Sequence, residues 1–588
     1  MSQNVPKPAF LGVEASLTGR RWVGLSPDQD RMAEAMSQQT NLPRPICQTL
    51  SRLGVPVDDA ERYLAPTLKE LLPDPSVLKD MDKAAERILK AAQASEKIAI
   101  FADYDVDGAT SAALLINWLR DMGRPATLYI PDRIDEGYGP NEPAMQALAA
   151  EHDLIICVDC GTLSHDALAA GSAADIIVLD HHLGGETLPP AHAVVNPNRQ
   201  DENGDLAHLC AAGVVFLTLI ALNRLLKQQG AQAPDLIALL DLVALGTVAD
   251  VAPLIGVNRA LVVQGLKIMG QRNRIGISTL ADVARMDTAP TSYHLGFLLG
   301  PRINAGGRVG TPDLGARLLS TNDKPEAEAL AERLDALNTE RREIEEQVRI
   351  AALAQAEERG FDAPLVWAAG QGWHPGVVGI VASRLKEATN RPAVVIGLED
   401  GIGKGSARSV TGIDLGAQIQ RLAMEGHLIK GGGHKMAAGL TVDETKLETA
   451  MQRLSELMDK QGAGALGPRD LKLDGLMMAG AANVPLVEQL EKAGPFGAGA
   501  AAPRFAFPDQ QIGFTKEVGQ GHLKLSFSDG MGAKIDAISF GAAENGLLQA
   551  LTQHKGQRFH LAGRVEINTW QGRQSVQLRL EDAAPAAG

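Results

Sequence analysis

Short apolar runs alternate with helical patterns through the first half of the chain. The runs are about four to six residues long and lie at 97–102, 127–130, 153–158, 175–179 and 192–195. Continuous apolar runs of this length are typical of buried parallel strands, and each pair of such strands needs a crossover helix between them. The pattern therefore predicts an α/β domain with a parallel sheet covered on both faces.

In the second half of the chain the pattern of hydrophobic and polar residues changes twice. After apolar helices over 211–227 and 235–248, residues 324–358 form one long charged segment, which is typical of a solvated helix between domains. The α/β alternation then resumes, with strands over 365–369 and 393–398. Helices are predicted over 377–387, 415–424 and 444–460. Alternating patterns at 522–527, 559–567 and 575–580 finally predict a small β-barrel.

Composition narrows the class of protein. The chain has 588 residues, a net charge of −15, 45% hydrophobic residues and four cysteines. This composition is globular, and the acidic balance argues against coating nucleic acid through an overall positive field, although a local basic groove stays possible. No export signal and no apolar run of about 18 residues is evident, so we expect a cytoplasmic protein without a membrane span.

Two cysteines form a CxxC pattern at Cys157 and Cys160. Such a pair can be a redox couple or half of a zinc site. Because no second CxxC exists and the pair ends an apolar strand, we favour two small buried residues instead.

Three aspartates alternate at the end of the first predicted strand. Asp103, Asp105 and Asp107 lie between that strand and a helix, followed by Gly108. The run resembles the start of a calcium loop, but its twelfth position is Leu114 and not glutamate, which excludes an EF-hand. Three carboxylates at one strand end repel one another strongly unless cations are bound, so the run implies divalent metal.

Other predicted elements also end in acids or histidines. One strand is followed by Asp159, another by Asp180, His181 and His182, and a helix by Asp250. Each alone is explained by a cap or a turn. Because ligands bind at the carboxyl ends of parallel strands, all of them together favour a metal centre. Oxygen and imidazole ligands suit Mn²⁺ or Mg²⁺, and a bridged pair of such ions hydrolyses phosphodiesters.

Four of these segments resemble the motifs of the DHH phosphoesterase superfamily. They are DYDVDG at 103–108, CVDC at 157–160, DHH at 180–182 and GTVAD at 246–250. Further segments narrow the resemblance to the single-strand-specific 5′→3′ exonucleases of the RecJ family: GPRINAGGR at 300–308, GWHPGVVGIVASR at 372–384, KGSARS at 404–409 and GGGHKMAAG at 431–439. The resemblance covers roughly residues 80 to 580.

The resemblance implies roles for the acidic residues. Asp105, Asp107, Asp159, His181 and Asp250 are expected to ligate two divalent ions, with Asp159 as the bridge and Asp103 close by. Asp180 is expected to orient the histidine next to it, and His182 to face the scissile phosphate.

It also implies a substrate pocket in a second domain, called DHHA1. Ser406 and Arg408 match a pocket for a terminal 5′-phosphate, with Arg133 as a third member. Gly433 and His434 are expected to close over the substrate, while Arg302 and Arg308 are candidates for backbone phosphates. Arginine forks grip phosphate in bidentate fashion, which suits these roles.

The C-terminal β-domain resembles an OB-fold, which binds single strands by stacking bases on aromatic side chains. Trp570 lies in a predicted turn and is the preferred stacking candidate, whereas we expect Phe527 and Phe540 to fill the barrel.

We therefore expect five segments. They are an N-terminal accessory segment (1–75), a DHH catalytic domain (76–322), a connecting helix (323–360), a DHHA1 domain (361–466) and an OB-like domain (467–588). The function implied is metal-dependent degradation of single-stranded DNA to mononucleotides in recombination and repair. The family also implies single-strand-binding protein and a RecQ-type helicase as partners. A phosphodiesterase for short oligonucleotides or dinucleotides, and a non-catalytic single-strand scaffold, are the alternatives.

Overall fold

The computed structural model describes residues 8–133, 135–465 and 469–586. The described chain forms two compact units. The larger unit comprises residues 73–252 and 261–467, and the smaller comprises 1–72, 253–260 and 468–588. The expected domain boundary at 466/467 lies outside the described residues.

A five-stranded parallel sheet opens the larger unit, with the strand order β3-β2-β4-β5-β6. Its strands are β2 (Ile98–Ala102), β3 (Thr127–Tyr129), β4 (Leu154–Val158), β5 (Asp175–Leu179) and β6 (Ala193–Val195). Nearly every residue of the central strands β2, β4 and β5 is buried. This burial explains why the strands read as continuous apolar runs and not as an alternation.

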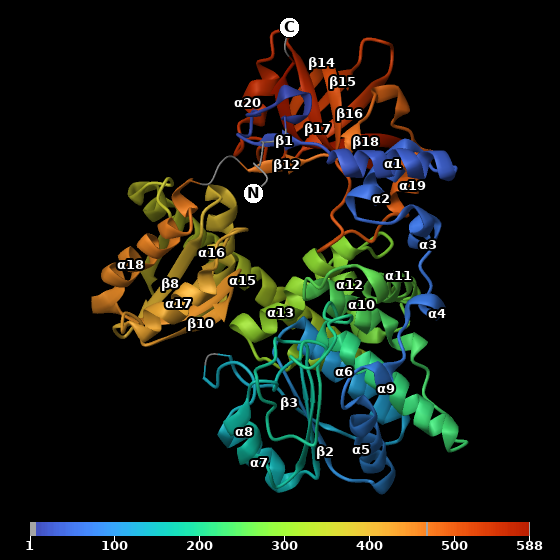
Figure 1. The fold of residues 1–588 in the computed structure, drawn as a ribbon, viewed down its shortest axis with the longest axis vertical. Helices are drawn as coiled ribbons and strands as arrows, with labels where there is room; N and C mark the ends of the chain where they lie inside the picture. The colour runs from blue at the N-terminus through green and yellow to red at the C-terminus, as the bar shows by residue number, and fades with distance from the viewer. Residues whose placement is uncertain (1–7, 134, 466–468, 587–588) are drawn as a thin grey trace. The chain divides into compact units, whose positions relative to one another are not determined.

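Helices cover both faces of this sheet (Figure 1). On one face, α7 (Glu142–Glu151) and α8 (His165–Ala170) pack through Met145 and Leu168 onto Phe101 and Val178. The helices of the other face are α5 (Met81–Ala94), α6 (Val106–Asp121) and α9 (Ala211–Gln228), and α10 (Leu240–Ala249) packs on α6 and α9. The α/β architecture expected from the sequence is confirmed.

Among the described residues, one helix is long and apolar enough to cross a membrane by length and composition alone. It is α9, an 18-residue helix that is 72% buried inside the protein. The sequence predicts an apolar helix over 211–227, in which Arg224 and Lys227 interrupt the apolar residues near the end. Because its side chains pack against α5, α6 and α10, α9 serves as a core helix.

A series of helices leads from this sheet to the second half of the unit. They are α11 (Gly256–Gly270), α12 (Ile275–Val283), the π-helical segment η5 (His294–Leu299), α13 (Gly300–Val309), α14 (Leu314–Ser320) and the 36-residue α15 (Lys324–Arg359). Asp323 caps α15, accepting a hydrogen bond from the backbone N–H of Glu326. The first half of α15 packs on α12 and α13, and its second half on α16 (Pro375–Thr389).

The second sheet of the unit is mixed, with the order β10-β11-β9-β8-β7. Its strands are β7 (Val366–Gln371), β8 (Ala393–Glu399), β9 (Ile402–Arg408), β10 (Lys430–His434) and β11 (Ala437–Asp443). Only β7 and β8 run parallel. One face packs on α15 and α16, and the other on α17 (Leu415–Met424) and α18 (Leu447–Lys460).

The smaller unit contains a closed barrel of five strands. β14 (Phe505–Val518), β15 (His522–Ser528), β16 (Lys534–Ser539), β18 (Arg573–Pro585) and β17 (Arg558–Trp570) pair in that order, and β17 pairs back with β14. The expected β-barrel is therefore confirmed. Phe507 and Phe527 meet edge to face in its core.

The N-terminal segment belongs to this barrel unit, which its sequence did not indicate. β1 (Arg21–Val23) pairs in parallel with β12 (Asp470–Lys472). The helices α1 (Pro27–Gln39) and α2 (Arg44–Arg52) bury apolar side chains in the same core as the barrel. Arg259 also joins this unit, because its guanidinium donates to the carbonyls of Tyr63, Lys492 and Ala493.

Candidate active site

Three adjacent parallel strands of the first sheet end at the same level. The register pairs Ala102 of β2 with Val158 of β4, and Val158 with Leu179 of β5. The next residues along the chain are Asp103, Asp159 and Asp180, and all three are buried. The sheet therefore gathers at one edge the carboxylates that the sequence places at strand ends.

The turn after β2 is shaped by its own side chains. The carboxylate of Asp105 caps α6, accepting hydrogen bonds from the backbone N–H groups of Asp107 and Gly108. A Cβ on Gly108 would lie 2.3 Å from the carbonyl oxygen of Asp103, so only glycine fits there. The run of alternating aspartates thus makes one tight strand-to-helix turn.

Asp159 and His181 lie at the centre of the cluster. Asp159 has a φ of 59°, a left-handed conformation that is uncommon for a residue with a side chain. The Nε2 atom of His181 lies 3.2 Å from Asp159 Oδ1 and 3.8 Å from carboxylate oxygens of both Asp107 and Asp250. One imidazole thus faces three carboxylates that come from separate parts of the sequence.

The ligand atoms form three overlapping groups. Within each group the ligand atoms lie within 4.8 Å of one another. The groups are Asp103/Asp105/Asp159, Asp107/His181/Asp250 and Asp159/His181/His182. Asp159 belongs to two groups, as expected of a carboxylate shared between two ions.

The electrostatics of the cluster favour bound cations. Burial, followed by the charges of Asp105 and Asp107, raises the pKa of Asp159 well above its usual range. Burial and the neighbouring acids raise the pKa of Asp250 to about 9. Among the described residues, the buried Oδ1 of Asp103 has no hydrogen-bond partner. The residues fit divalent ions, because carboxylates so placed need positive charge to stay ionised.

Asp180 orients a different histidine from the one expected. Its Oδ1 lies 2.8 Å from Nδ1 of His182, whereas it meets His181 only through the backbone N–H. The expectation that Asp180 orients its immediate neighbour is therefore wrong, since the turn after β5 directs the ring of His181 toward Asp159. Burial lowers the pKa of His182, but Asp180 more than offsets this and raises it to about 9.

Tyr138 connects this cluster to a second feature of the unit. Its hydroxyl lies 3.1 Å from Nε2 of His182 and 3.2 Å from the carbonyl oxygen of Asp159. Burial and the charge of Asp159 raise the pKa of Tyr138, which keeps the hydroxyl protonated. The same side chain lines a neighbouring cavity.

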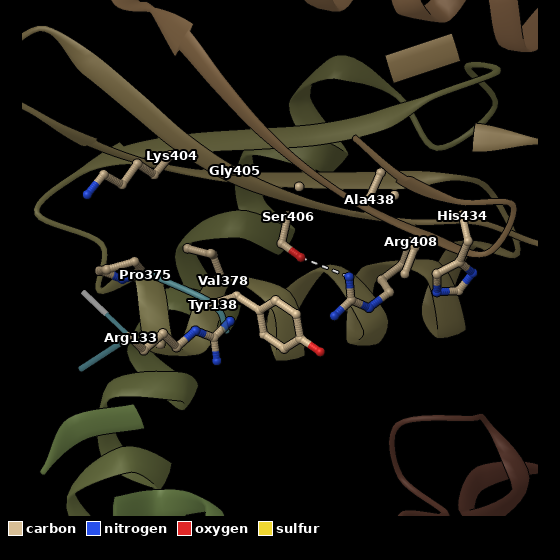
Figure 2. Close-up of a pocket in the computed structure, with 14 residues that line it drawn as sticks. Arg133, Tyr138, Pro375, Val378, Lys404, Gly405, Ser406, Arg408, His434 and Ala438 are labelled. Atoms are coloured by element: carbon tan, nitrogen blue, oxygen red, sulfur yellow. Dashed lines mark hydrogen bonds between the residues drawn. The ribbon is translucent and has the colours of Figure 1, made fainter. Parts of the chain in front are cut away.

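That cavity, the phosphate pocket, has a volume of about 580 Å³ and a basic lining. Figure 2 shows Arg408 and Ser406 projecting from the second sheet toward Tyr138 and Arg133. The expected pocket residues Arg133, Ser406, Arg408, Gly433 and His434 all line it. The structure thus brings these five together from both halves of the unit.

Local geometry fixes the two residues of the KGSARS motif. Ser406 and Arg408 are two positions apart on β9, so both point to the same face of the sheet. Arg408 donates a hydrogen bond to the Ser406 hydroxyl at 2.8 Å. A Cβ on Gly379 of α16 would lie 3.1 Å from both side chains, which is closer than ordinary van der Waals contact, so glycine at this position gives them room.

The charge of the pocket favours an anion. Burial, followed by the charge of Arg133, lowers the pKa of Arg408. The guanidinium of Arg133 lies 5.2 Å from the ring centroid of Tyr104, which helps to hold it in place. Two arginines that face one shared cavity repel each other until an anion is bound between them.

Arg302 and Arg308 are not among the residues that line the pocket. Arg302 forms an ion pair with Asp335 of α15 at 2.8 Å. Arg308 donates to the carbonyl of Gly376, and burial lowers its pKa to about 10. Their expected role as phosphate contacts stays a prediction, although the structure gives both of them partners within the protein.

Two lining residues with polar side chains were missed by sequence reasoning. Tyr138 and Lys404 both line the pocket. Lys404 is the first residue of the KGSARS motif and alternates with Ser406 and Arg408, so strand periodicity could have identified it. No comparable pattern marks Tyr138, because its turn gives no regular spacing.

Of the three aromatic residues considered in the barrel, two have the exposure that the sequence predicted and one does not. Trp570 is 72% exposed at the end of β17, so its ring is accessible. Phe527 is buried, but Phe540 is 50% exposed and its ring centroid lies 5.2 Å from the guanidinium of Arg579. The prediction that Phe540 fills the barrel is wrong, because this residue follows the last position of β16 and leaves the alternation of the strand.

Comparisons with known families match three parts of the chain. Residues 97–247 match the DHH family N-terminal domain, residues 362–460 the DHHA1 domain, and residues 473–582 the RecJ OB domain. These matches confirm the resemblance drawn from the motifs.

Whole-chain relatives agree. The single-stranded-DNA-specific exonuclease RecJ of Dickeya dadantii is 38% identical over 93% of this chain and 98% of its own length. The enzyme of the same description from Escherichia coli is 38% identical over 86% of this chain and 91% of its own.

A solved structure shows the same fold. RecJ from Thermus thermophilus in complex with Mn²⁺ superposes with a TM-score of 0.78 and 29% identity, over 96% of this chain and 79% of the other. A complex of the same protein with Mg²⁺ gives a TM-score of 0.72. Both ions named in these structures are ones that the acidic cluster was expected to hold.

Proposed function

Because the chain belongs to the RecJ family of single-stranded-DNA-specific exonucleases, we propose that it removes mononucleotides from the 5′ end of single strands. The observation that carries this proposal is that the acidic cluster and the phosphate pocket share one side chain, Tyr138. Tyr138 contacts the acidic cluster through its hydroxyl and lines the phosphate pocket with its ring. A 5′-phosphate held in the pocket places the first phosphodiester at the cluster.

In this mechanism the acidic residues hold two divalent ions, Mn²⁺ or Mg²⁺. When bound, such ions activate water and stabilise the charge that develops on the phosphate. Asp103, Asp105 and Asp159 would hold one ion, and Asp107, His181 and Asp250 the other. Asp159 would serve both, because its Oδ1 lies 3.2 Å from Nε2 of His181. His182 faces the phosphate and is held in position by Asp180 and Tyr138.

Arg408, Ser406 and Arg133 bind the terminal phosphate, and Gly433 and His434 form the adjacent wall. Because the pocket binds the 5′-terminal phosphate of the DNA and not an internal phosphate, degradation proceeds from the 5′ end. Arg302 and Arg308 are assigned to backbone phosphates on the family resemblance alone. Trp570 is assigned to base stacking on the resemblance and on the exposure of its ring.

The resemblance further supports a cytoplasmic setting. There the enzyme would work with single-strand-binding protein and a RecQ-type helicase. Co-purification of each candidate partner with the tagged chain tests this part separately.

The test uses the full chain with Mn²⁺ and 5′-phosphorylated oligonucleotides of 2 to 30 residues, labelled at either end. We expect the 5′ label to appear at once as a mononucleotide, while the 3′ label moves through a ladder of shortening strands. Long single strands should be hydrolysed faster than dinucleotides, and blunt duplex should resist.

Internal cuts, or loss of the 3′ label first, would contradict the proposal. A preference for dinucleotides would instead indicate a phosphodiesterase for short oligonucleotides. Binding without hydrolysis in any divalent metal would indicate a scaffold.

A further inference from the structure

The sheet register arranges the pocket face of β9, β11 and β10 in three rows. Antiparallel partners point to the same face, so each row crosses the three strands. The rows are Arg408–Ala437–His434, Ser406–Gly439–Gly432 and Lys404–Thr441–Lys430. Successive rows are two residues apart along the strands, which is about 7 Å.

The middle row has no side chains beyond Ser406. A Cβ added to Gly432 or Gly439 would meet nothing within 4 Å, and neither residue has a positive φ. Neither packing nor backbone conformation therefore requires glycine at these positions. Their effect is to leave open the floor between the first row and the third.

The third row carries two positive charges. Lys404 lines the same 580 Å³ cavity as Arg408, and Lys430 follows across Thr441. Within the part of the chain that the structure describes, neither Lys404 nor Lys430 forms an ion pair. These two lysines are available to bind a second anionic group.

The two ends of the pocket differ in their distance from the acidic cluster. Figure 2 shows the ring of Tyr138 below Ser406 and beside Arg408, with Lys404 at the far end of the pocket from Arg408 and His434. The hydroxyl of Tyr138 contacts His182 of the cluster. A DNA strand that runs from its 5′-terminal phosphate, bound at Arg408, to the acidic cluster does not occupy the Lys404 end of the pocket. That end is free for further groups bonded to the 5′-terminal phosphate.

We propose that Lys404 and Lys430 form a second anion subsite that accepts the outer phosphates of a 5′-triphosphate end. The inference rests on the terminal-phosphate position of the proposed function. Hydrolysis then breaks the bond between phosphorus and the 3′ oxygen of the first nucleotide. The oxygen of water joins that phosphorus, a proton passes to the 3′ oxygen, and a nucleoside triphosphate leaves.

The test compares (dT)12 strands that carry a 5′-hydroxyl, a 5′-monophosphate or a 5′-triphosphate, with the full chain and Mn²⁺. Wild-type enzyme should release thymidine triphosphate as the first product of the last strand, with a kcat/KM within about threefold of the monophosphate strand. Lys404→Met should lower kcat/KM for the triphosphate strand about tenfold, or ~1.4 kcal/mol, and that for the monophosphate strand less than twofold.

Two further variants serve as controls. Lys404→Arg should restore hydrolysis of the triphosphate strand, and Lys460→Met, which removes an exposed charge at the end of α18, should change neither substrate. Inorganic triphosphate should inhibit the wild-type enzyme more strongly than orthophosphate, and this difference should disappear in Lys404→Met.

A wild-type enzyme that hydrolyses the monophosphate strand but rejects the triphosphate strand would overturn the inference and leave the proposed function intact. Equal losses on both strands in Lys404→Met would also overturn it, because Lys404 would then contact the DNA strand itself. If Arg408→Ala affects 5′-hydroxyl and 5′-phosphate strands alike, the terminal-phosphate position fails first.

Discussion

The acidic cluster and the phosphate pocket are neighbours in the larger unit, yet they are built in opposite ways. The cluster gathers buried carboxylates at strand ends, around His181 and Asp159. The pocket gathers Lys404 and Arg408 on one face of the second sheet, together with Arg133 from the loop after β3. Its middle row holds Ser406 and two glycines. Each is electrostatically unfavourable when empty, the first for lack of cations and the second for lack of an anion.

This difference predicts separate roles for the two regions, hydrolysis at the acidic cluster and recognition of the 5′ end in the pocket. In the proposed function, the cluster stabilises the charge that develops on the scissile phosphate, so changes there should reduce turnover on every substrate. In the same proposal the pocket binds a phosphate that does not react, so the effect of changes there should depend on what the 5′ end carries. Tyr138 contacts both and should show a mixed effect.

The largest effect is expected from Asp159→Asn. Loss of the shared carboxylate should reduce kcat at least 10³-fold, ~4 kcal/mol of barrier, on 5′-phosphate and 5′-hydroxyl strands alike. Binding of strands in Ca²⁺ should stay measurable by fluorescence anisotropy, since the pocket is intact. A variant that retains more than about a tenth of wild-type kcat would contradict the bridging role.

Arg408→Ala should affect selection and leave the chemistry in place. We expect kcat/KM for 5′-phosphorylated strands to fall about 30-fold, ~2 kcal/mol, because a buried arginine–phosphate pair is lost. Strands with a 5′-hydroxyl should change less than threefold, as measured by initial rates in parallel reactions. An equal loss on both ends would remove Arg408 from the terminal-phosphate position.

Tyr138→Phe tests the connection between the two regions. It removes one hydrogen-bonding hydroxyl from His182 and the Asp159 carbonyl, so kcat should fall about three- to tenfold, consistent with ~1 kcal/mol. The affinity for Mn²⁺, measured by calorimetry, should not change. A fall in metal affinity comparable to that of Asp159→Asn would show that Tyr138 organises the cluster itself.

The smallest effect is expected from Arg302→Ala. Because Arg302 is paired with Asp335, its removal should change the preference for a 5′-phosphate less than twofold. The ratio of kcat/KM for the two kinds of end measures this preference. If the ratio falls as far as in Arg408→Ala, the ion pair must open when DNA binds.

The cluster could be predicted from the sequence because its acids follow apolar strands, and parallel strands align their ends. The pairing of Asp180 with His182 depends on the direction of a turn, which no residue pattern encodes. The sharing of a core by α1, α2 and the barrel was equally hidden, since contacts across more than 400 residues leave no local signal. Deleting residues from 467 onward would therefore expose this core as well as remove Trp570, the residue proposed to stack on bases.

The proposed chemistry depends above all on two divalent ions held in the acidic cluster through one shared carboxylate. Equilibrium dialysis of the full chain against Mn²⁺ tests this without any substrate. We predict two ions per chain for the wild type and at most one for Asp159→Asn, with Arg408→Ala unchanged at two. A wild-type stoichiometry of one, or two ions retained in Asp159→Asn at the same affinity, would contradict the shared carboxylate.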